Sequence, residues 1–170
     1  MTSRLERMIA RLITQRACIG AAARRVEHLE GPVLEIGLGK GRTYTHLRQV
    51  FAGREIIAFD ADLHAPPGAA PPQDCLLLGD FRETLPAMAR RRPGQAVLVH
   101  ADFGSEDCDA DKALAQEIAA PITELVAPQG IVVSDRPLSH PALGQIALPA
   151  IELPEGIAPW RYFMYETAQS

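Results

Sequence analysis

The chain has 170 residues, of which 47% are hydrophobic and 22% charged, and its formal net charge at pH 7 is −4. These values are typical of one globular domain with enough apolar material for a core. The negative balance gives no overall attraction to nucleic acid or to an anionic membrane, so neither is an expected partner. The cysteines Cys18, Cys75 and Cys108 follow no metal-binding or redox spacing, and no apolar run is long enough to span a bilayer. We therefore expect a cytoplasmic protein.

The first 30 residues are predicted to be helical. Ser3 and Glu6 have the spacing of a capping box, and apolar residues then recur at helical spacing. This pattern predicts a helix over residues 3–17, and a second helical segment after Gly20 that runs up to His28. We expect residues 1–30 to pack as a helical segment on a domain formed by residues 31–170. Covering one side of the core is the favoured role, and partly closing a ligand site is the alternative.

Short apolar segments then alternate with helical ones. Strands are predicted at residues 33–36, 55–59, 75–78, 96–100 and 131–134, and helices at 43–52, 84–91 and 111–126, with a kink or break at Pro121. Two more strands are predicted at 145–153 and 161–166. The first five strands are apolar throughout, which is typical of parallel strands covered on both sides. The expected fold is α/β: a Rossmann-like, doubly wound, mostly parallel seven-stranded sheet with helices on both faces.

Glycines or a carboxylate follow each of the first five strands. The first strand leads into Gly37, Gly39 and Gly41, and the later strands end at Asp60, Asp80, Asp102 and Asp135. Ligands bind at the carboxyl ends of such strands, and buried carboxylates there need hydrogen-bond donors, which a bound adenosine supplies. The glycine spacing does not fit a dinucleotide-binding loop, because Arg42 occupies the position of its third glycine, so an NAD-dependent oxidoreductase is disfavoured. It does not fit a phosphate-binding P-loop either, because Lys40 precedes Gly41 rather than Ser or Thr.

The pattern Glu35-x-Gly37-x-Gly39-x-Gly41 resembles motif I of the class I S-adenosylmethionine-dependent methyltransferases. The resemblance continues through the acidic strand ends and the Pro-Gln-Gly turn at residues 128–130, and it covers residues 33–135. It implies a methyltransferase that binds S-adenosyl-L-methionine and releases S-adenosyl-L-homocysteine.

The resemblance also implies roles for individual residues. The loop from Gly37 to Gly41 would pass under the methionine moiety and the ribose. Asp60 would accept both ribose hydroxyls, and Asp102 or His100 would lie near the methionyl amine and the reactive methyl. The residues that this resemblance assigns to the cofactor are Glu35, Gly37, Leu38, Gly39, Gly41, Asp60, Ala61, Gly79, Asp80, Phe81 and Asp102.

Three of these assignments have alternatives. Asp62 competes with Asp60 for the ribose, although Asp60 directly follows the strand and is preferred. Asp80 is assigned to the adenine amino group, and the alternative is that it caps the next helix. Glu35 lies inside a strand, where a charge needs a partner, and it is expected to pair with loop amides or with the cofactor's amine.

Methyl transfer needs an acceptor held in line with the methyl group, and a base only where the acceptor must lose a proton. His100 and Asp102 are the best-placed catalytic residues. Catechol-type O-methyltransferases hold a metal with an aspartate after the fourth strand and an Asp-Asn pair after the fifth. Here Arg136 follows Asp135, which puts a cation where that family has a ligand, so no metal is expected.

The expected function is methyl transfer to a small molecule. The alternative is a protein of the same fold that binds S-adenosylmethionine or a nucleotide without catalysis, as a sensor or partner subunit. The chain leaves little room for inserted substrate-binding segments, so a homodimer or higher homo-oligomer is a further expectation, in which a second copy completes the site.

Overall fold

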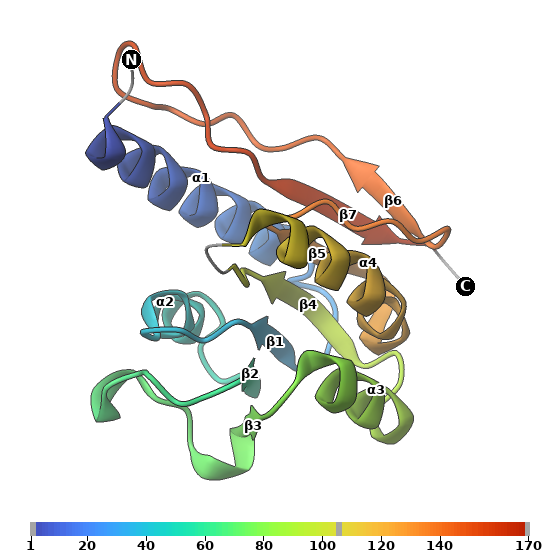
Figure 1. The fold of residues 1–170 in the computed structure, drawn as a ribbon. Helices are drawn as coiled ribbons and strands as arrows, with labels where there is room; N and C mark the ends of the chain where they lie inside the picture. The colour runs from blue at the N-terminus through green and yellow to red at the C-terminus, as the bar shows by residue number, and fades with distance from the viewer. Residues whose placement is uncertain (1–2, 105–106, 169–170) are drawn as a thin grey trace.

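The computed structural model describes residues 3–104 and 107–168, and within these residues seven strands form one sheet (Figure 1). The order across the sheet is β3-β2-β1-β4-β5-β7-β6. Strands β1 to β5 pair in parallel, and β7 runs antiparallel to both of its neighbours. The strands are β1 (Val33–Ile36), β2 (Ile56–Asp60), β3 (Leu76–Leu78), β4 (Ala96–Ala101), β5 (Val126–Ser134), β6 (Leu143–Ile146) and β7 (Phe163–Thr167). The predicted fold class is confirmed.

Helices cover both faces of the sheet (Figure 1). The helices are α1 (Arg4–Arg25), α2 (Arg42–Val50), α3 (Phe81–Arg91) and α4 (Cys108–Leu125), with the short 3-10 turns η1 (Pro67–Ala69) and η2 (Gln73–Cys75). Helices α1 and α2 pack on one face and α3 and α4 on the other. Within β1, Val33 faces the first layer and Leu34 the second. Because successive side chains of a strand point to opposite faces, an apolar strand contributes to two cores.

Helix α1 is one continuous helix, so the predicted interruption before residue 20 is wrong. Its capping box is confirmed, since the Ser3 hydroxyl accepts from the Glu6 amide and Glu6 accepts from the Ser3 amide. Glycine in a helix costs about 1 kcal/mol, and the full burial of Ile19 and Ala22 on either side of Gly20 offsets it.

Helix α4 is not broken at Pro121, where the sequence predicted a kink or break, because it continues to Leu125. Strand β6 ends at Ile146, whereas the sequence predicted a strand over residues 145–153. Pro149 lacks an N–H and cannot donate to a strand ladder, and no strand lies between β6 and β7 in this described segment. None of the described helices has both the length and the apolar character needed to cross a bilayer.

Candidate active site

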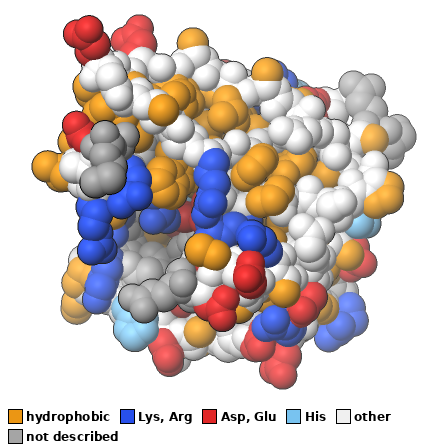
Figure 2. All heavy atoms as spheres, turned by 45° about the horizontal axis from the view of Figure 1, so that its top comes forward, with side chains coloured by type: hydrophobic (Ala, Val, Ile, Leu, Met, Phe, Trp, Pro, Cys, Tyr) orange, Lys and Arg blue, Asp and Glu red, His pale blue; other side chains and the backbone are white. Residues whose placement is uncertain are grey.

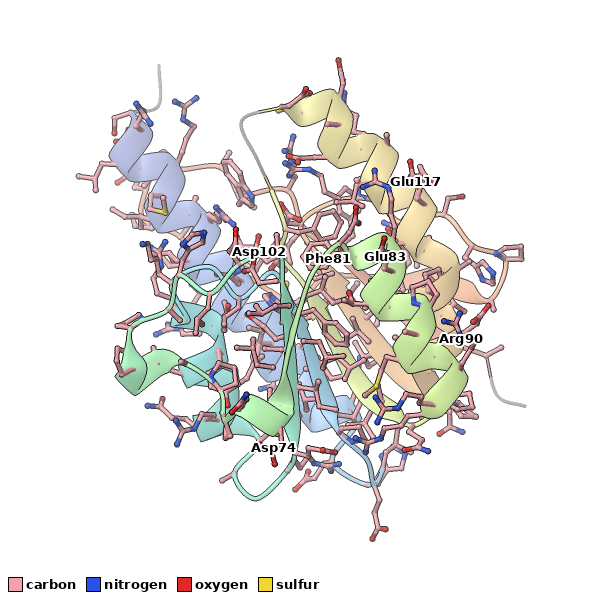
Figure 3. All side chains as sticks on the ribbon, turned by 60° about the horizontal axis from the view of Figure 1, so that its bottom comes forward. Asp74, Phe81, Glu83, Arg90, Asp102 and Glu117 are labelled. Atoms are coloured by element: carbon pink, nitrogen blue, oxygen red, sulfur yellow. The ribbon has the colours of Figure 1, made fainter. Side chains whose placement is uncertain are left out.

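Two adjoining cavities open at the carboxyl ends of β1, β2 and β4. We call the first, of about 350 Å³, the Asp60 cavity, since Asp60, Phe81 and Leu114 line it. The second, of about 270 Å³, is the α1 cavity, bordered by Arg11 and Gln15 of α1. Their shared wall consists of Gly37, Gly39, Asp102 and Gly104. Asp102 and Phe81 lie at the same end of the sheet, whereas Asp74 lies at the opposite end (Figure 3).

The three glycines after β1 do different things. A Cβ on Gly37, at φ 92°, would lie 2.3 Å from the carbonyl oxygen of Asp102, and one on Gly41, at φ 72°, would lie 2.4 Å from that of Ala69. The chain therefore needs glycine at both positions to pack against itself. A Cβ on Gly39 would meet nothing within 4 Å. Only at Gly39 does the missing side chain leave open space beside the cavities.

Asp60 is held at the edge of its cavity by two backbone amides. Its Oδ2 accepts from the Gly39 N–H at 2.7 Å and its Oδ1 from the Ala61 N–H at 2.7 Å. A carboxylate has about four acceptor positions, so capacity for two further donors is left. Asp62 is exposed and does not belong to the lining of this cavity as the structure describes it.

Asp80 is the N-cap of α3, as the alternative interpretation proposed. Its Oδ1 accepts from the Arg82 N–H at 2.8 Å, and the Arg82 guanidinium lies 3.5 Å from its Oδ2. The next residue, Phe81, meets Phe103 edge to face, with ring centroids 6.0 Å apart. A shallow hollow formed by Ala61, Gly79, Asp80, Phe81 and Leu114 continues from this wall. The apolar side chains of this hollow can pack against a flat aromatic ring.

Glu35 has different partners from those expected. It is fully buried and accepts from the Thr43 hydroxyl, and its Oε2 lies 2.8 Å from His100 Nδ1, so the expected pairing with loop amides is wrong. The Nε2 of His100 lies 2.7 Å from the Tyr162 hydroxyl. Complete burial is the largest single influence and acts to lower the pKa of His100, but the charge and hydrogen bond of Glu35, with the charges of Asp102 and Asp135, together raise the net pKa. Both ring nitrogens of His100 are occupied, and the ring contributes to neither cavity wall as described.

The same hydrogen-bond network reaches the cavities through α1. Gln15 donates to the Tyr162 hydroxyl at 3.2 Å and to Oδ2 of Asp102, and Arg11 binds Oδ1 of Asp102 at 2.5 Å. Burial, followed by the charge of Asp102, raises the pKa of Tyr162 well above its usual value, so it stays a phenol. Sequence reasoning missed Arg11, Gln15 and Tyr162. The available signal was that Arg11 and Gln15 lie four residues apart on the predicted helix.

A second buried cluster follows β5. The guanidinium of Arg136 binds Asp135 Oδ2 at 2.8 Å and Asp111 Oδ2 at 2.7 Å. Burial, with the charge of Asp102, raises the pKa of Asp135 to about 7, although Arg136 opposes this. Its Oδ1 is buried without a hydrogen-bond partner among residues 3–104 and 107–168. Arg136 occupies the place of a metal ion between these carboxylates, so the residues do not fit a divalent cation.

The comparison with known proteins agrees with this geometry. Residues 2–167 match the model of a protein family described as S-adenosyl-L-methionine methyltransferase. The chain belongs to this family. An S-adenosyl-L-methionine methyl transferase from Silicibacter pomeroyi DSS-3 is 39% identical in sequence, and the match covers 99% of this chain and 100% of that one with a TM-score of 0.88. No curated protein matches the methyltransferase chain significantly in sequence.

More distant solved structures share the fold alone. TrmN from Thermus thermophilus is 18% identical, with a TM-score of 0.62 over 87% of this chain and 48% of its own. The 1,6-didemethyltoxoflavin-N1-methyltransferase of Burkholderia thailandensis is 16% identical, with a TM-score of 0.57 over 91% of this chain and 80% of its own. The predicted family, enzyme class and cofactor are confirmed: this methyltransferase uses S-adenosyl-L-methionine.

Proposed function

We propose that the methyltransferase acts on a small molecule bound in the α1 cavity, while the adenosine of S-adenosyl-L-methionine occupies the Asp60 cavity. The observation that carries this proposal is that the two cavities meet at Gly37, Gly39 and Asp102. When bound, the cofactor supplies an electrophilic methyl group on sulfur. A methyl donor on one side of this junction and an acceptor on the other have the arrangement that in-line transfer requires.

The residues of the Asp60 cavity fit the adenosine. The remaining acceptor capacity of Asp60 suits two ribose hydroxyls, and the open space at Gly39 allows close approach of the backbone. Phe81 and Leu114 offer an apolar wall to the adenine. Arg82 engages both oxygens of Asp80, so a contact with the adenine amine would use the acceptor capacity that this carboxylate has left.

Asp102 is the best candidate for a catalytic residue. It lines both cavities, so it can meet the methionyl amine on one side or accept a proton from the acceptor on the other. His100 is buried behind it and reaches it only through Tyr162 and Gln15. We therefore propose His100 as a positioning residue rather than as the base.

The size of the α1 cavity favours a small acceptor. At about 270 Å³ it is near the lower end of the range for ligand pockets, which begins at about 300 Å³. A protein of the same fold, the Burkholderia thailandensis enzyme, was crystallised with 1,6-didemethyltoxoflavin and S-adenosylhomocysteine bound.

The test is the release of S-adenosylhomocysteine in the presence of three separate fractions: pooled small metabolites, total RNA and DNA, and unmodified proteins. We expect release above background with the metabolite pool only. Release that depends on RNA, DNA or protein would refute a small-molecule acceptor while leaving methyl transfer itself intact. Asp102→Asn is expected to slow release with the active pool, because it removes the carboxylate at the junction.

A further inference from the structure

Positive charge gathers around the α1 cavity, although the whole chain has a net charge of −4. Lys40, Arg42 and Arg11 line the cavity, and Asp102 is the only acidic residue in its described lining. An adjoining hollow is bordered by Arg4, Arg7 and Arg11 of α1. Figure 2 shows Lys and Arg side chains around a hollow on this face, next to exposed hydrophobic side chains. The local charge is therefore opposite in sign to that of the chain.

Most of this positive charge is not neutralised by the protein. Arg11 is paired with Asp102, at 2.5 Å. Lys40 and Arg42 form no ion pair with any residue in the described part of the chain, and neither do Arg4 and Arg7. Unpaired cations that share one hollow repel one another, which raises the electrostatic free energy of the site. An anion bound between them offsets this repulsion.

The cofactor does not supply the missing negative charge. Its sulfonium and its amine are cationic and its carboxylate is anionic, so S-adenosyl-L-methionine brings a net positive charge. Its carboxylate can engage one of the cations, which leaves at least one of Lys40 and Arg42 unpaired. After cofactor binding the α1 cavity attracts anions more strongly than before.

The other wall of the same cavity is apolar. Met8 and Leu12 lie one turn apart on α1, line the cavity, and are 41% and 40% exposed. Exposed apolar side chains beside a basic wall suit a ligand that has both an apolar and an anionic part. No aromatic side chain stands in the described lining of the α1 cavity, and the adjoining hollow offers the single ring of Trp160. Successive nucleobases therefore have no row of rings to stack on, which favours a small molecule over a polynucleotide.

We infer that the methyl acceptor has an apolar body, which contacts Met8 and Leu12, and an anionic group, a carboxylate or a phosphate, which Lys40 and Arg42 bind. This inference rests on the proposed function, because it describes the acceptor of the same site.

Two probes that differ only in charge test it. The protein is saturated with S-adenosylhomocysteine, and binding of 2-naphthoate and of 2-naphthamide is measured by calorimetry. We expect the anion to bind about tenfold more tightly than the amide, and its advantage to shrink as salt is added. Equal affinities, or no binding of either probe, would overturn the inference. Stronger binding of a single-stranded RNA of about twelve nucleotides would also overturn it, in favour of a nucleic-acid substrate.

Variants show whether the assigned cations are responsible. The double variant Lys40→Gln/Arg42→Gln is expected to lose the preference for naphthoate. Arg90→Gln, on α3 away from the cavities (Figure 3), should keep it. A preference that survives in the double variant would overturn the assignment of these cations. If the wild type does not bind S-adenosylhomocysteine at all, the proposed function fails; if it binds and naphthoate has no advantage, only this inference fails.

A second control separates acceptor binding from cofactor binding. In the double variant, S-adenosylhomocysteine is compared with 5′-methylthioadenosine, which lacks the carboxylate and the amine. Similar affinity of wild type and variant for both nucleosides supports a role toward the acceptor. Selective loss of S-adenosylhomocysteine affinity would assign at least one cation to the cofactor's carboxylate, and the single variants Lys40→Gln and Arg42→Gln then separate the two. Loss in both single variants would assign both cations to the cofactor and would overturn the inference.

Discussion

Asp60 is oriented by the amides of Gly39 and Ala61, so its carboxylate faces the cavity before any ligand binds. Asp60→Ala is expected to raise the dissociation constant of S-adenosylhomocysteine about 10- to 100-fold, because the two hydrogen bonds proposed from the ribose would lose a charged acceptor. Calorimetry measures this directly. Asp62→Ala is the matched control and should bind like the wild type.

Asp60→Ala also removes the acceptor of two loop amides, so Asp60→Asn is the second variant. Its amide oxygen can still accept one of these bonds, and a loss in both variants points to the carboxylate itself. Wild-type affinity in Asp60→Ala would show that the ribose is held elsewhere.

Asp135 predicts a pH dependence of stability. Its pKa is raised by burial from 3.8 to about 7, so the folded state binds a proton that the unfolded state releases between these two pH values. The free energy of unfolding should therefore fall as the pH rises through this window, by at most about 4 kcal/mol, and then level off. Asp135→Asn cannot titrate, so the wild type should lose stability relative to this variant over the same window. Urea denaturation from pH 4.5 to 8 measures the difference, and parallel curves would contradict the raised pKa.

At the scale of the element, the glycine loop after β1 contains two kinds of glycine. Gly37→Ala is expected to destabilise the fold by about 3 kcal/mol or more, because its Cβ would meet the backbone of Asp102 at 2.3 Å and its φ is 92°. Gly39→Ala should cost only about 1 kcal/mol, because its φ of 51° disfavours a side chain but nothing lies within 4 Å of the added Cβ. Denaturation curves compare the two variants.

For cofactor affinity we expect the opposite order: Gly39→Ala should weaken binding more than Gly37→Ala. Gly39 lines the cavity in which the cofactor is proposed to lie, and a methyl group there meets no protein atom within 4 Å, so Gly39→Ala is expected to fold and to bind S-adenosylhomocysteine weakly. If Gly39→Ala binds normally, the cofactor does not approach this part of the loop.

At the scale of the whole molecule, α1 belongs to the core. Cys18, Ile19 and Ala22 are fully buried in the layer that covers one face of the sheet, and Asp102 holds the helix to the end of β4. We expect residues 1–30 and the sheet to unfold in one cooperative step. Trp160 borders the same hollow as the start of α1, so its fluorescence reports on that region. Its transition should coincide with that of far-UV circular dichroism, and two separate transitions would indicate that α1 unfolds on its own.

Charge distribution is also a property of the whole molecule. The negative net charge of the chain suggested that nucleic acid is a poor partner. Net charge is a sum over the whole surface, however, and the residues around the α1 cavity are basic. Substrate choice depends on the local field inside a cavity rather than on the sum over the chain. The expected homo-oligomer remains a prediction.

The amino-acid sequence by itself determined the elements and the edge of the sheet at which the site lies. Strand residues such as Val33 and Leu34 are apolar on both faces, which is typical of a parallel sheet covered on both sides. Local periodicity and strand-end residues are short-range signals, so they placed Asp60, Asp102 and the glycine loop at one edge of the sheet. The resemblance to methyltransferases then assigned them to the cofactor. The continuity of α1 could not be predicted from these signals, because burial against distant segments decides it.

Only the tertiary structure decided which side chains meet. His100 is adjacent to the strand end in sequence, yet its partners are Glu35 and Tyr162, which lie 65 and 62 residues away. Likewise, the backbone of Asp102 leaves no room for a Cβ at Gly37, whereas Gly39 has open space and favours glycine only through its φ of 51°. Contacts of this kind depend on how helices and strands pack, and a one-dimensional pattern contains no distance between segments that are far apart along the chain.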